Sequence, residues 1–535
     1  MRCRPFCIAG RSIMSSNSHS AVAWLSSTCL SGVTEQRAGV RKFDEETKPM
    51  KTLTLAALLG ATALTAPAKA QTAPSAADIQ ALKAQIDALQ AKVTELEAQM
   101  QASKATAAAA SAAPAAQAPV KTAEASAPSW KGAPQFEDKA KGFSFKPTGF
   151  FQFDTGYVGN PDDAIATTNL GYRTRARRIV LGAQGSLPGG FGYKAEFNFA
   201  NGEVGYEDVI LTWQGKGSPL LVTLGNQFPL SGLDAVTSSK LGTVLERDQA
   251  TDAFGFARRI GASMGLVDPK DRYTLTAGIF QGPINNSFSD NQWQASIRGT
   301  FAPWIGDNGR LHLGANYQHR ENATTMTPQA RYRARPFTQL TDVRFVDTGT
   351  LNVRGDDILG VELAGIFGPF HFASEARKLW TDGYSPSTGN TGAGQVLESA
   401  PDFFQGYVEA GFFFTGDTRA YKAGKWDRVK VSNPVDKGGI GAIQLNARLD
   451  YLDLSDRFAS DLVPAPILIN GGQQTGYEMS LIWNPVDYLR FLLQYSHIEV
   501  EGGPQAATVV PVSTRPVDQR SYGTDSVALR AQIEF

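Results

Sequence analysis

Cysteine is almost missing from this chain of 535 residues, and its three copies, Cys3, Cys7 and Cys29, lie close to the N-terminus. The long remainder therefore offers no disulfide and no thiolate chemistry. Histidine is also scarce, with five copies, and none of them forms a His-x-x-x-His pair or joins a dense carboxylate cluster with metal-ligand spacing. The sequence therefore predicts neither a metal site nor a cofactor.

Long apolar runs and a net charge are missing as well. The mean hydropathy of −0.22 excludes a helical membrane protein. It does not exclude a membrane β-barrel, whose strands alternate apolar residues with polar ones. Lys plus Arg and Asp plus Glu both number 51, so overall charge gives no argument for a nucleic-acid partner.

An export signal is predicted over residues 50–70. Met50 and Lys51 form a charged start, a short apolar run follows, and an Ala-x-Ala cleavage site ends at Ala70. The apolar run is too short to be a transmembrane helix. We interpret residues 1–49 as a mis-assigned upstream extension; the alternative is an unusually long signal region. In either case the mature protein is expected to be exported.

Residues 71–100 predict a short coiled-coil helix, because apolar residues recur at alternating intervals of three and four. Position a is taken by Ile or Val and once by Met, and position d by Leu, a choice that favours a parallel dimer. A single amphipathic helix packed on a domain is the alternative. Residues 101–141 are rich in Ala, Pro, Ser and Thr and predict a linker. Both segments are expected in the periplasm, with the helix available for contact with the cell wall.

Residues 142–535 predict an all-β fold. Segments of about ten residues alternate apolar and polar side chains with a period of two, which is typical of strands with one apolar and one wet face. In one segment Trp293, Ala295 and Ile297 share a face, while Gln294 and Arg298 lie on the other. A soluble β-sandwich could show this pattern. So long a stretch without a helix favours a transmembrane antiparallel β-barrel of about 16 strands, with 18 as the alternative.

Connection lengths indicate the orientation of this barrel. Tight turns are expected at 187–190, 268–271, 368–369 and 484–487. Long polar connections are expected at 158–171, 320–356, 379–404, 418–438 and 453–475. Short turns on one side and long loops on the other are typical of bacterial outer-membrane barrels.

The last ten residues, Ser526–Phe535, predict the strand that closes the barrel. Its apolar face is expected to meet lipid, and Arg530, Gln532 and Glu534 are expected to face the lumen. The strand should pair with the one around residues 150–157.

Arginine is the residue type that suggests a function. An Arg facing lipid at mid-membrane costs about 2–4 kcal/mol, so these side chains should face the lumen or lie outside the bilayer. Rows of guanidinium groups in a lumen attract anions and pair with phosphate or carboxylate oxygens. The candidate pore-lining residues are Arg173, Arg175, Arg177, Arg258, Arg259, Arg331, Arg333, Arg335, Lys240 and Arg247.

The alternative is that these cations only hold the lumen together by pairing with carboxylates. The candidate partners are Asp154, Glu196, Asp208, Glu246 and Asp248.

Residues 231–250 are the predicted constricting loop, because this segment is long and polar and holds Lys240, Glu246 and Arg247. Ser263 lies in a Gly-x-Ser-x-Gly motif, but within an alternating strand and not on a strand-turn-helix elbow. No Gly-rich phosphate loop precedes a helix in this region. We therefore expect no enzyme.

Several blocks resemble the phosphate-selective porins O and P. They are Gly149–Asp154, Arg173–Gly182, Leu224–Pro229, Leu233–Lys240, Leu245–Arg247, Phe414–Tyr421, Ala447–Tyr451 and Trp483–Pro485. The likeness covers essentially all of 142–535. It implies a barrel of about 16 strands in the outer membrane, a homotrimer, and passive diffusion of small, phosphate-like anions. It also implies that the terminal Phe535 is read by the barrel-assembly machinery.

Two alternatives to this function stay open. A general or sugar-permeable porin would show little anion selectivity. A structural barrel would tether the envelope through the helix at 71–100.

Overall fold

The computed structural model describes residues 91, 92, 94, 95, 98, 129–130, 132–200, 202–284, 292–322, 329–386, 396–459 and 465–535. The chain divides into two compact units, Met1–Pro119 and Val120–Phe535. In the first unit, the five described residues are helical. The predicted signal peptide and the apolar heptad positions lie outside the described residues.

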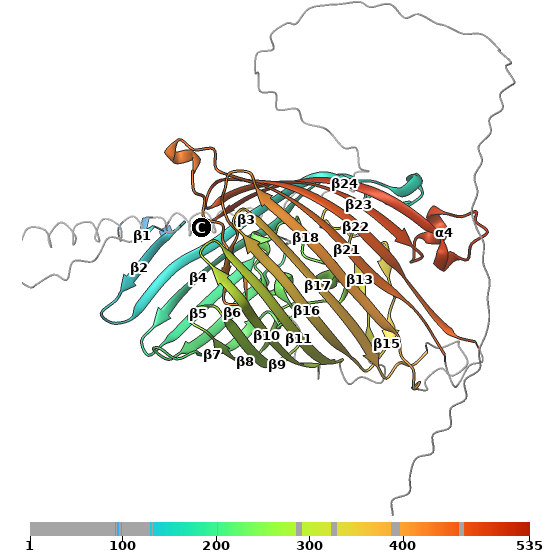
Figure 1. The fold of residues 1–535 in the computed structure, drawn as a ribbon, viewed down its shortest axis with the longest axis horizontal. Coiled ribbons are helices and arrows are strands. Elements are labelled where there is room, and N and C mark those ends of the chain that lie inside the picture. The colour runs from blue at the N-terminus through green and yellow to red at the C-terminus, as the bar shows by residue number, and fades with distance from the viewer. Residues whose placement is uncertain are drawn as a thin grey trace, which may run out of the picture. The chain divides into compact units, whose positions relative to one another are not determined.

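The second unit contains a closed antiparallel barrel of sixteen strands, as the alternating pattern predicts (Figure 1). Each strand pairs with the next along the chain, and the last pairs with the first, so no edge remains open within the barrel. The strands are β3 (Phe143–Val158), β4 (Gly171–Leu187), β5 (Phe191–Asn198), β6 (Gly205–Gln214), β7 (Leu220–Gln227), β8 (Arg259–Val267), β9 (Tyr273–Gln281), β10 (Trp293–Gly306), β11 (Gly309–Glu321), β16 (Gly355–Phe367), β17 (Phe370–Asp382), β18 (Asp402–Phe413), β21 (Ala442–Phe458), β22 (Ile467–Val486), β23 (Leu489–Glu501) and β24 (Ser521–Glu534).

Two short strands precede the barrel and bring the sheet to eighteen strands: β1 (Ser129–Trp130) and β2 (Pro134–Asp138). Strand β2 pairs with the start of β3, where Phe136 lies opposite Phe145. The end of the predicted linker is therefore part of the sheet.

The closing strand β24 has the predicted faces. Arg530, Gln532 and Glu534 are buried, whereas Leu529 and Ile533 are among the exposed large apolar residues. Ser526 pairs with Val158, and Glu534 pairs with Phe150. Polar residues therefore face the lumen, and apolar residues form the outer surface.

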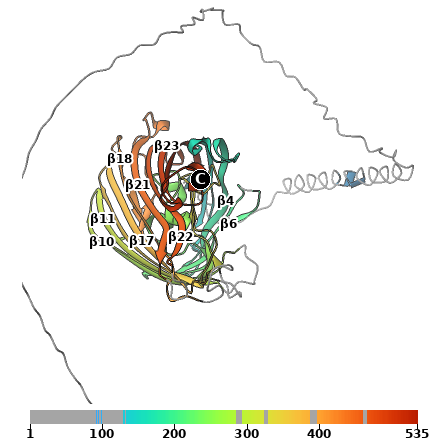
Figure 2. The same ribbon diagram turned by 90° about the vertical axis from the view of Figure 1, so that its right-hand side faces the viewer.

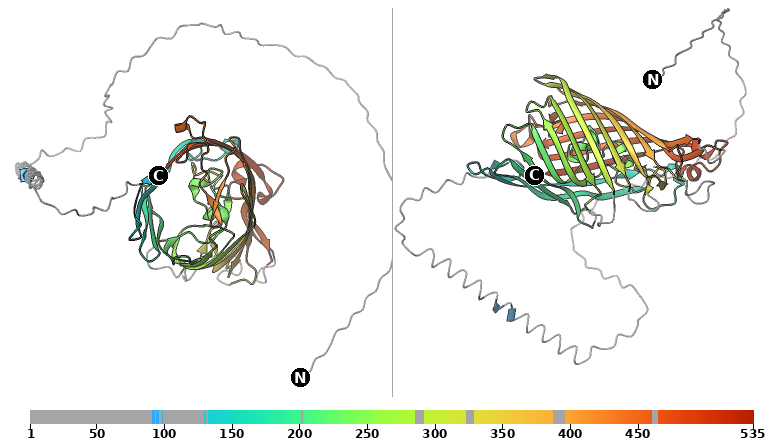
Figure 3. Two further views of the ribbon diagram at one scale, coloured as in Figure 1. Left: turned by 60° about the vertical axis from the view of Figure 1, so that its left-hand side comes forward. Right: turned by 90° about the horizontal axis from the view of Figure 1, so that it is seen from below.

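Two connections from one end of the barrel lie inside it (Figure 3). Segment 228–258, between β7 and β8, contains α2 (Leu233–Val236), η2 (Ser239–Leu241) and α3 (Gln249–Ala253). The connection between β11 and β16 contains two short antiparallel strand pairs, one nested inside the other: β12 (Gln329–Ala330) with β15 (Leu351–Asn352), and between them β13 (Arg333–Ala334) with β14 (Val346–Asp347). We call this end the loop end. The other connections there contain η1 (Pro161–Asp163), α4 (Ala506–Val509) and η4 (Val517–Gln519).

A buried apolar cluster fills part of the lumen at the loop end. It joins α3 and the β12–β15 region to wall residues, and its members include Phe254, Tyr332, Phe337, Phe345 and Leu454. The lumen at this end is partly filled by these side chains. The remaining passage must therefore run elsewhere in the barrel.

Residues 414–441 lie at the end of the barrel opposite to the one that connection length predicts. The stretch 418–438 was expected among the long connections of the loop end, but it joins β18 to β21 at the opposite, short-turn end. There Phe413 N donates to Pro369 O, in the short turn between β16 and β17, at 3.0 Å. The segment contains a hairpin, β19 (Ala420–Lys422) with β20 (Lys425–Asp427), and η3 (Val435–Lys437). Figure 2 labels β18 and β21, the two strands that the segment joins. Connection length alone cannot assign an end of the barrel, because an in-folded turn is also long.

Candidate functional site

Segment 228–258 crosses the lumen and is fastened to the wall opposite its own strands. Leu233 N donates to Glu375 of β17 at 2.9 Å. Leu245 N donates to Gln494 of β23 at 2.6 Å, and Gln249 N donates to Asp450 of β21 at 3.0 Å. These bonds satisfy backbone donors that would otherwise be buried without a partner. The predicted constricting loop, 231–250, lies inside this segment.

A bulge in β4 turns two consecutive arginines toward the lumen. Gln152 of β3 pairs with Arg178, and the next residue of β3, Phe153, pairs with Ala176. Arg177 is therefore the extra residue of a β-bulge, which changes the direction of the side chains beside it. Arg177 reaches Glu246 of the crossing segment, and Arg178 reaches Glu207 of β6.

A second bulge, in β6, turns two consecutive carboxylates, Glu207 and Asp208, toward the lumen. Ala195 of β5 pairs with Val209, and Phe197 pairs with Tyr206, which leaves Glu207 and Asp208 opposite a single residue. Both carboxylates meet cations: Glu207 pairs with Arg178 and Arg258, and Asp208 pairs with Arg258 and Lys194.

These elements enclose a cavity of about 390 Å³ between the crossing segment, β4, β6 and the approach to β8. Its charged lining is balanced, with five arginines and five carboxylates. They are Arg177, Arg178, Arg247, Arg258 and Arg335, and Glu207, Asp234, Glu246, Asp248 and Asp252. Most of this charge is paired, so the cavity is not simply cationic.

Glu246 of the crossing segment is paired with two arginines from different strands. Arg177 donates two hydrogen bonds of 2.8 Å to it, and Arg530 donates another of 2.8 Å. Burial alone would raise the pKa of Glu246, but the charges and hydrogen bonds of Arg177 and Arg530 hold that pKa well below its usual range. Glu246 is therefore ionised, and its charge offsets the guanidinium groups beside it.

Arg247 differs from the other four cavity arginines in the partners of its side chain. It donates to the carbonyl of Thr237 at 2.6 Å and lies over the ring of Phe228, 5.1 Å from the centroid. Among the described residues it has no salt bridge. Burial and the charge of Arg258 lower its pKa, but an arginine still keeps its proton near neutral pH. Arg247 is thus the cavity cation whose charge is least compensated.

The other residues predicted to line the pore lie in separate parts of the barrel. Arg173 and Arg175 lie on β4 nearer the loop end, where Arg175 donates to Gln339 O at 2.7 Å. Arg259 begins β8 at the same end and donates to Gln281 O at 3.4 Å. Lys240 lies toward the turn end, 3.0 Å from Glu534 of β24.

The row Arg331, Arg333 and Arg335 lies in the in-folded connection and not in the barrel wall. Arg331 pairs with Asp347, Arg335 pairs with Asp252 at 3.1 Å, and Arg333 is exposed. The structure therefore brings Arg177, Arg258, Arg335 and Arg247 to one cavity, and it leaves Arg331, Arg259 and Lys240 outside it.

Several lumen arginines were missed as candidate site residues. Arg377 is completely buried between Asp248 and Glu375. Arg448 forms salt bridges with both Asp234 and Glu409. Arg298 binds Glu362 and also donates to Gly424 O at the tip of the β19–β20 hairpin, which we call the turn-end hairpin. The only sequence signal for them was their place on the wet face of an alternating strand, which many residues share.

The turn-end hairpin contacts both the barrel wall and the crossing segment. The hydroxyl of Tyr421 lies 2.7 Å from Nδ1 of His312 of β11, and Trp426 N donates to Thr237 of the crossing segment at 3.3 Å. Nearby, a second cavity of about 410 Å³ lies along β3–β6 and is lined by Lys146 and Lys194. Two successive cavities therefore follow the β3–β8 side of the lumen.

No helix among the described residues is long and apolar enough to cross a membrane. Within the same residues, no group of three or more His, Cys, Asp or Glu side chains is arranged to hold a metal ion.

The family model described as phosphate-selective porin O and P matches residues 145–535. An uncharacterized protein of Caulobacter vibrioides is 35% identical over 417 residues, which cover 76% of this chain and 77% of that protein. Porin O of Pseudomonas aeruginosa is 27% identical over 358 residues, covering 61% of this chain and 76% of its own length. Among solved structures, the outer membrane channel DcaP of Acinetobacter baumannii has a TM-score of 0.42 at 15% identity, covering 75% of this chain and 99% of its own.

Proposed function

Because this chain belongs to the phosphate-selective porin O and P family and is an outer-membrane porin, we propose that it conducts small anions, with phosphate as the candidate solute. The proposal rests on Arg247, which lines the cavity of about 390 Å³ and has no salt bridge among the described residues. A ring of Arg or Lys in a narrow pore selects anions by replacing part of their hydration shell.

The proposed route begins at the loop end, beside Arg173 and Arg175 of β4. It continues through the cavity between Arg178, Arg247 and Arg258, and it leaves along Lys194 toward the turn end. Guanidinium groups can share their donors between a fixed carboxylate and a passing anion, because each has five N–H groups. The paired carboxylates keep these arginines in place, and Arg247 supplies a charge that no salt bridge among the described residues offsets.

The second candidate is a general porin with weak selectivity, and the balance of five arginines and five carboxylates around the cavity favours it. In this case the arginines of β4 mainly fasten the crossing segment, and the lumen passes small polar solutes of either sign. A channel is proposed in both cases, and an enzyme in neither.

Competition between phosphate and chloride separates the two candidates. The purified chain is placed in a planar bilayer, and the chloride current is recorded while phosphate is added to the loop-end side. A current that falls as phosphate increases supports the anion channel. A chloride current that phosphate does not reduce, together with equal permeability to potassium, supports the general porin instead. The Arg247→Ala variant should weaken any block by phosphate.

A further inference from the structure

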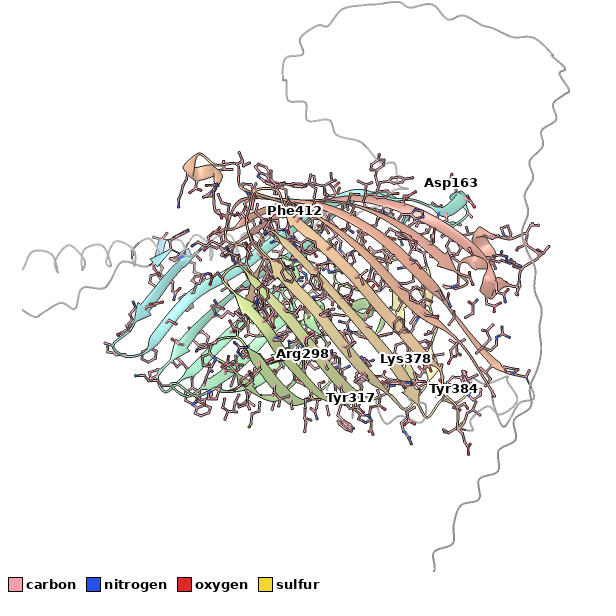
Figure 4. The ribbon with its side chains drawn as sticks, viewed as in Figure 1. Asp163, Arg298, Tyr317, Lys378, Tyr384 and Phe412 are labelled. Carbon is pink, nitrogen blue, oxygen red and sulfur yellow. The ribbon has the colours of Figure 1, made fainter. Side chains whose placement is uncertain are left out.

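The buried carboxylates of the lumen usually face a guanidinium group. Arg298 of β10, labelled in Figure 4, donates two hydrogen bonds to Glu362 of β16, at 2.8 and 2.7 Å. Asp154, Asp356 and Glu375 each have an arginine nitrogen within 2.7 Å in the same way. A buried carboxyl group that lacks such a partner is costly to ionise, and it tends to keep its proton instead.

Glu478 of β22 is a carboxyl group of this second kind. It is 3% exposed, and among the described residues it forms no salt bridge. The amide of Gln494 donates to its Oε2 at 2.8 Å, whereas its Oε1 has no hydrogen-bond partner in the same part of the chain. An ionised carboxylate accepts hydrogen bonds strongly at both oxygens. A buried oxygen without a donor therefore indicates the uncharged acid.

The arginine that lies opposite Glu478 is bound to other carboxylates. Arg448 of β21 is the direct neighbour of Glu478 in the strand register. Its Nε and Nη2 donate to Glu409 at 3.0 and 2.6 Å, and its Nη1 donates to Asp234 of α2 at 3.2 Å. This guanidinium group links the barrel wall to the crossing segment, and two other carboxylates already share its charge.

The charge around Glu478 also opposes its ionisation. From β21 come Arg448 and Asp450, from β18 comes Glu409, and from the crossing segment comes Asp234. Strand β23 contributes the uncharged side chains of Gln494 and Ser496. One cation is thus set against three carboxylates, and negative neighbours favour the protonated form of an acid.

We propose that Glu478 carries a proton at neutral pH and that this proton keeps the crossing segment fastened to the wall formed by β21, β22 and β23. With Glu478 uncharged, Arg448 is available to hold Asp234 of the crossing segment. Gln494 makes a second link, because its amide donates to Glu478 and its carbonyl accepts a hydrogen bond of 2.6 Å from Leu245 N.

Loss of the proton weakens this fastening. At alkaline pH the proton passes to water, and the carboxylate that remains competes with Asp234 for Arg448. The same carboxylate repels Asp234 and Glu409. The crossing segment is thereby loosened from this wall, so that the passage beside it responds to pH. This inference concerns regulation and does not depend on which solute the channel conducts.

Infrared spectroscopy of the purified barrel in heavy water detects the proton at neutral pH, because a protonated carboxyl group has a carbonyl band separate from that of a carboxylate. Glu478→Gln replaces the uncharged acid by an uncharged amide of similar shape. Glu362→Gln, which removes an arginine-paired carboxylate, is the control. Heat-modifiable mobility shows that each variant is folded. The expected result is a weaker protonated-carboxyl band in Glu478→Gln and an undiminished band in Glu362→Gln. An undiminished band in folded Glu478→Gln would overturn the proposal.

Thiol labelling of the crossing segment tests the fastening. Val244→Cys, at a position that is 4% exposed, is combined with replacement of Cys3, Cys7 and Cys29 by Ser. Labelling by a thiol reagent is compared with and without Glu478→Gln at the same pH, so that the thiolate fraction is matched. At alkaline pH the chain with Glu478 should react about fivefold faster, the effect of losing one hydrogen bond, and at neutral pH the rates should be equal. Equal rates at alkaline pH would overturn the fastening role. A channel without anion preference would change neither experiment.

Discussion

Arg177 and Glu246 join the barrel wall to the segment that crosses the lumen through two parallel hydrogen bonds of 2.8 Å. The same carboxylate accepts a 2.8 Å hydrogen bond from Arg530 on β24. One side chain of the crossing segment therefore links two separate strands and offsets guanidinium charge beside the cavity. This relationship leads to the first prediction, because removing the carboxylate charge should change selectivity.

Glu246→Gln should raise the ratio of anion to cation permeability. Glutamine cannot offset the charges of Arg177 and Arg530, so two guanidinium groups gain influence over passing ions. Breaking a buried pair also costs about 3–5 kcal/mol of stability, so folding is checked by heat-modifiable mobility. Reversal potentials in a salt gradient give the ratio. Asp357→Asn, on the outer surface, is the control and should leave it unchanged; a lower ratio for Glu246→Gln would contradict the account.

Arg247→Ala should lower anion preference more than Arg177→Ala does. A charge about 4 Å from an ion is worth about 1 kcal/mol in water-like surroundings, or about fivefold in relative permeability. Arg177 contributes less, because its charge is already offset by Glu246. Arg247→Lys keeps the charge and should retain most of the preference. An equal loss of anion preference in both alanine variants would contradict the claim that the salt bridge to Glu246 weakens the effect of Arg177 on the solute.

Gly476→Ala should displace the in-folded connection between β11 and β16. Phe337 packs its ring against Gly476 of β22, where an added Cβ would overlap the ring. Overpacking of this kind typically costs about 1–3 kcal/mol. Faster protease cleavage of the connection, in a barrel that stays folded, is the expected readout. Gly406→Ala is the control, since its Cβ would meet no atom closer than 3.4 Å. Equal cleavage of both variants would contradict the packing argument.

Anion preference should fall when the pH is raised into the alkaline range. Desolvation by the surrounding barrel lowers the pKa of Lys425 on the turn-end hairpin although its side chain is exposed, and the charges of Lys194 and Arg298 lower it further, while Asp208 opposes them. A lowered pKa means that Lys425 loses its proton at a lower pH than an ordinary lysine. Lys425→Arg should remove this part of the decline in the permeability ratio. A decline of the same size in Lys425→Arg would show that another group titrates.

The barrel could be predicted from the sequence because alternation is a local property. Each strand shows which of its residues are apolar, and the closing strand already separates Leu529 and Ile533 from Arg530 and Gln532. Strand number follows from counting such segments. The end of the barrel at which 418–438 lies does not follow, because in-folding at the turn end has no local sign.

The arrangement of the arginines could be predicted only in part. The spacing of Arg173, Arg175 and Arg177 predicts one shared face, but the bulge that adds Arg178 to the lumen depends on pairing with β3. The partners Glu246 and Glu207 are 69 and 29 residues away from the arginines that they bind. Of the expected carboxylate partners, Asp154 binds Arg530 and Asp248 binds Arg377, neither of which was a candidate. Pairing at such distances is set by barrel closure and has no sequence pattern.

The reversal potential of the unmodified chain in a planar bilayer shows whether the channel prefers anions or cations. With potassium chloride at a tenfold higher concentration on one side, the zero-current voltage gives the relative permeability of the two ions. The expected voltage has the sign that corresponds to preferred passage of chloride, and its magnitude is smaller for Arg247→Ala. A voltage of the opposite sign, showing preferred passage of potassium, would contradict the claim that the charge of Arg247 makes this passage prefer anions.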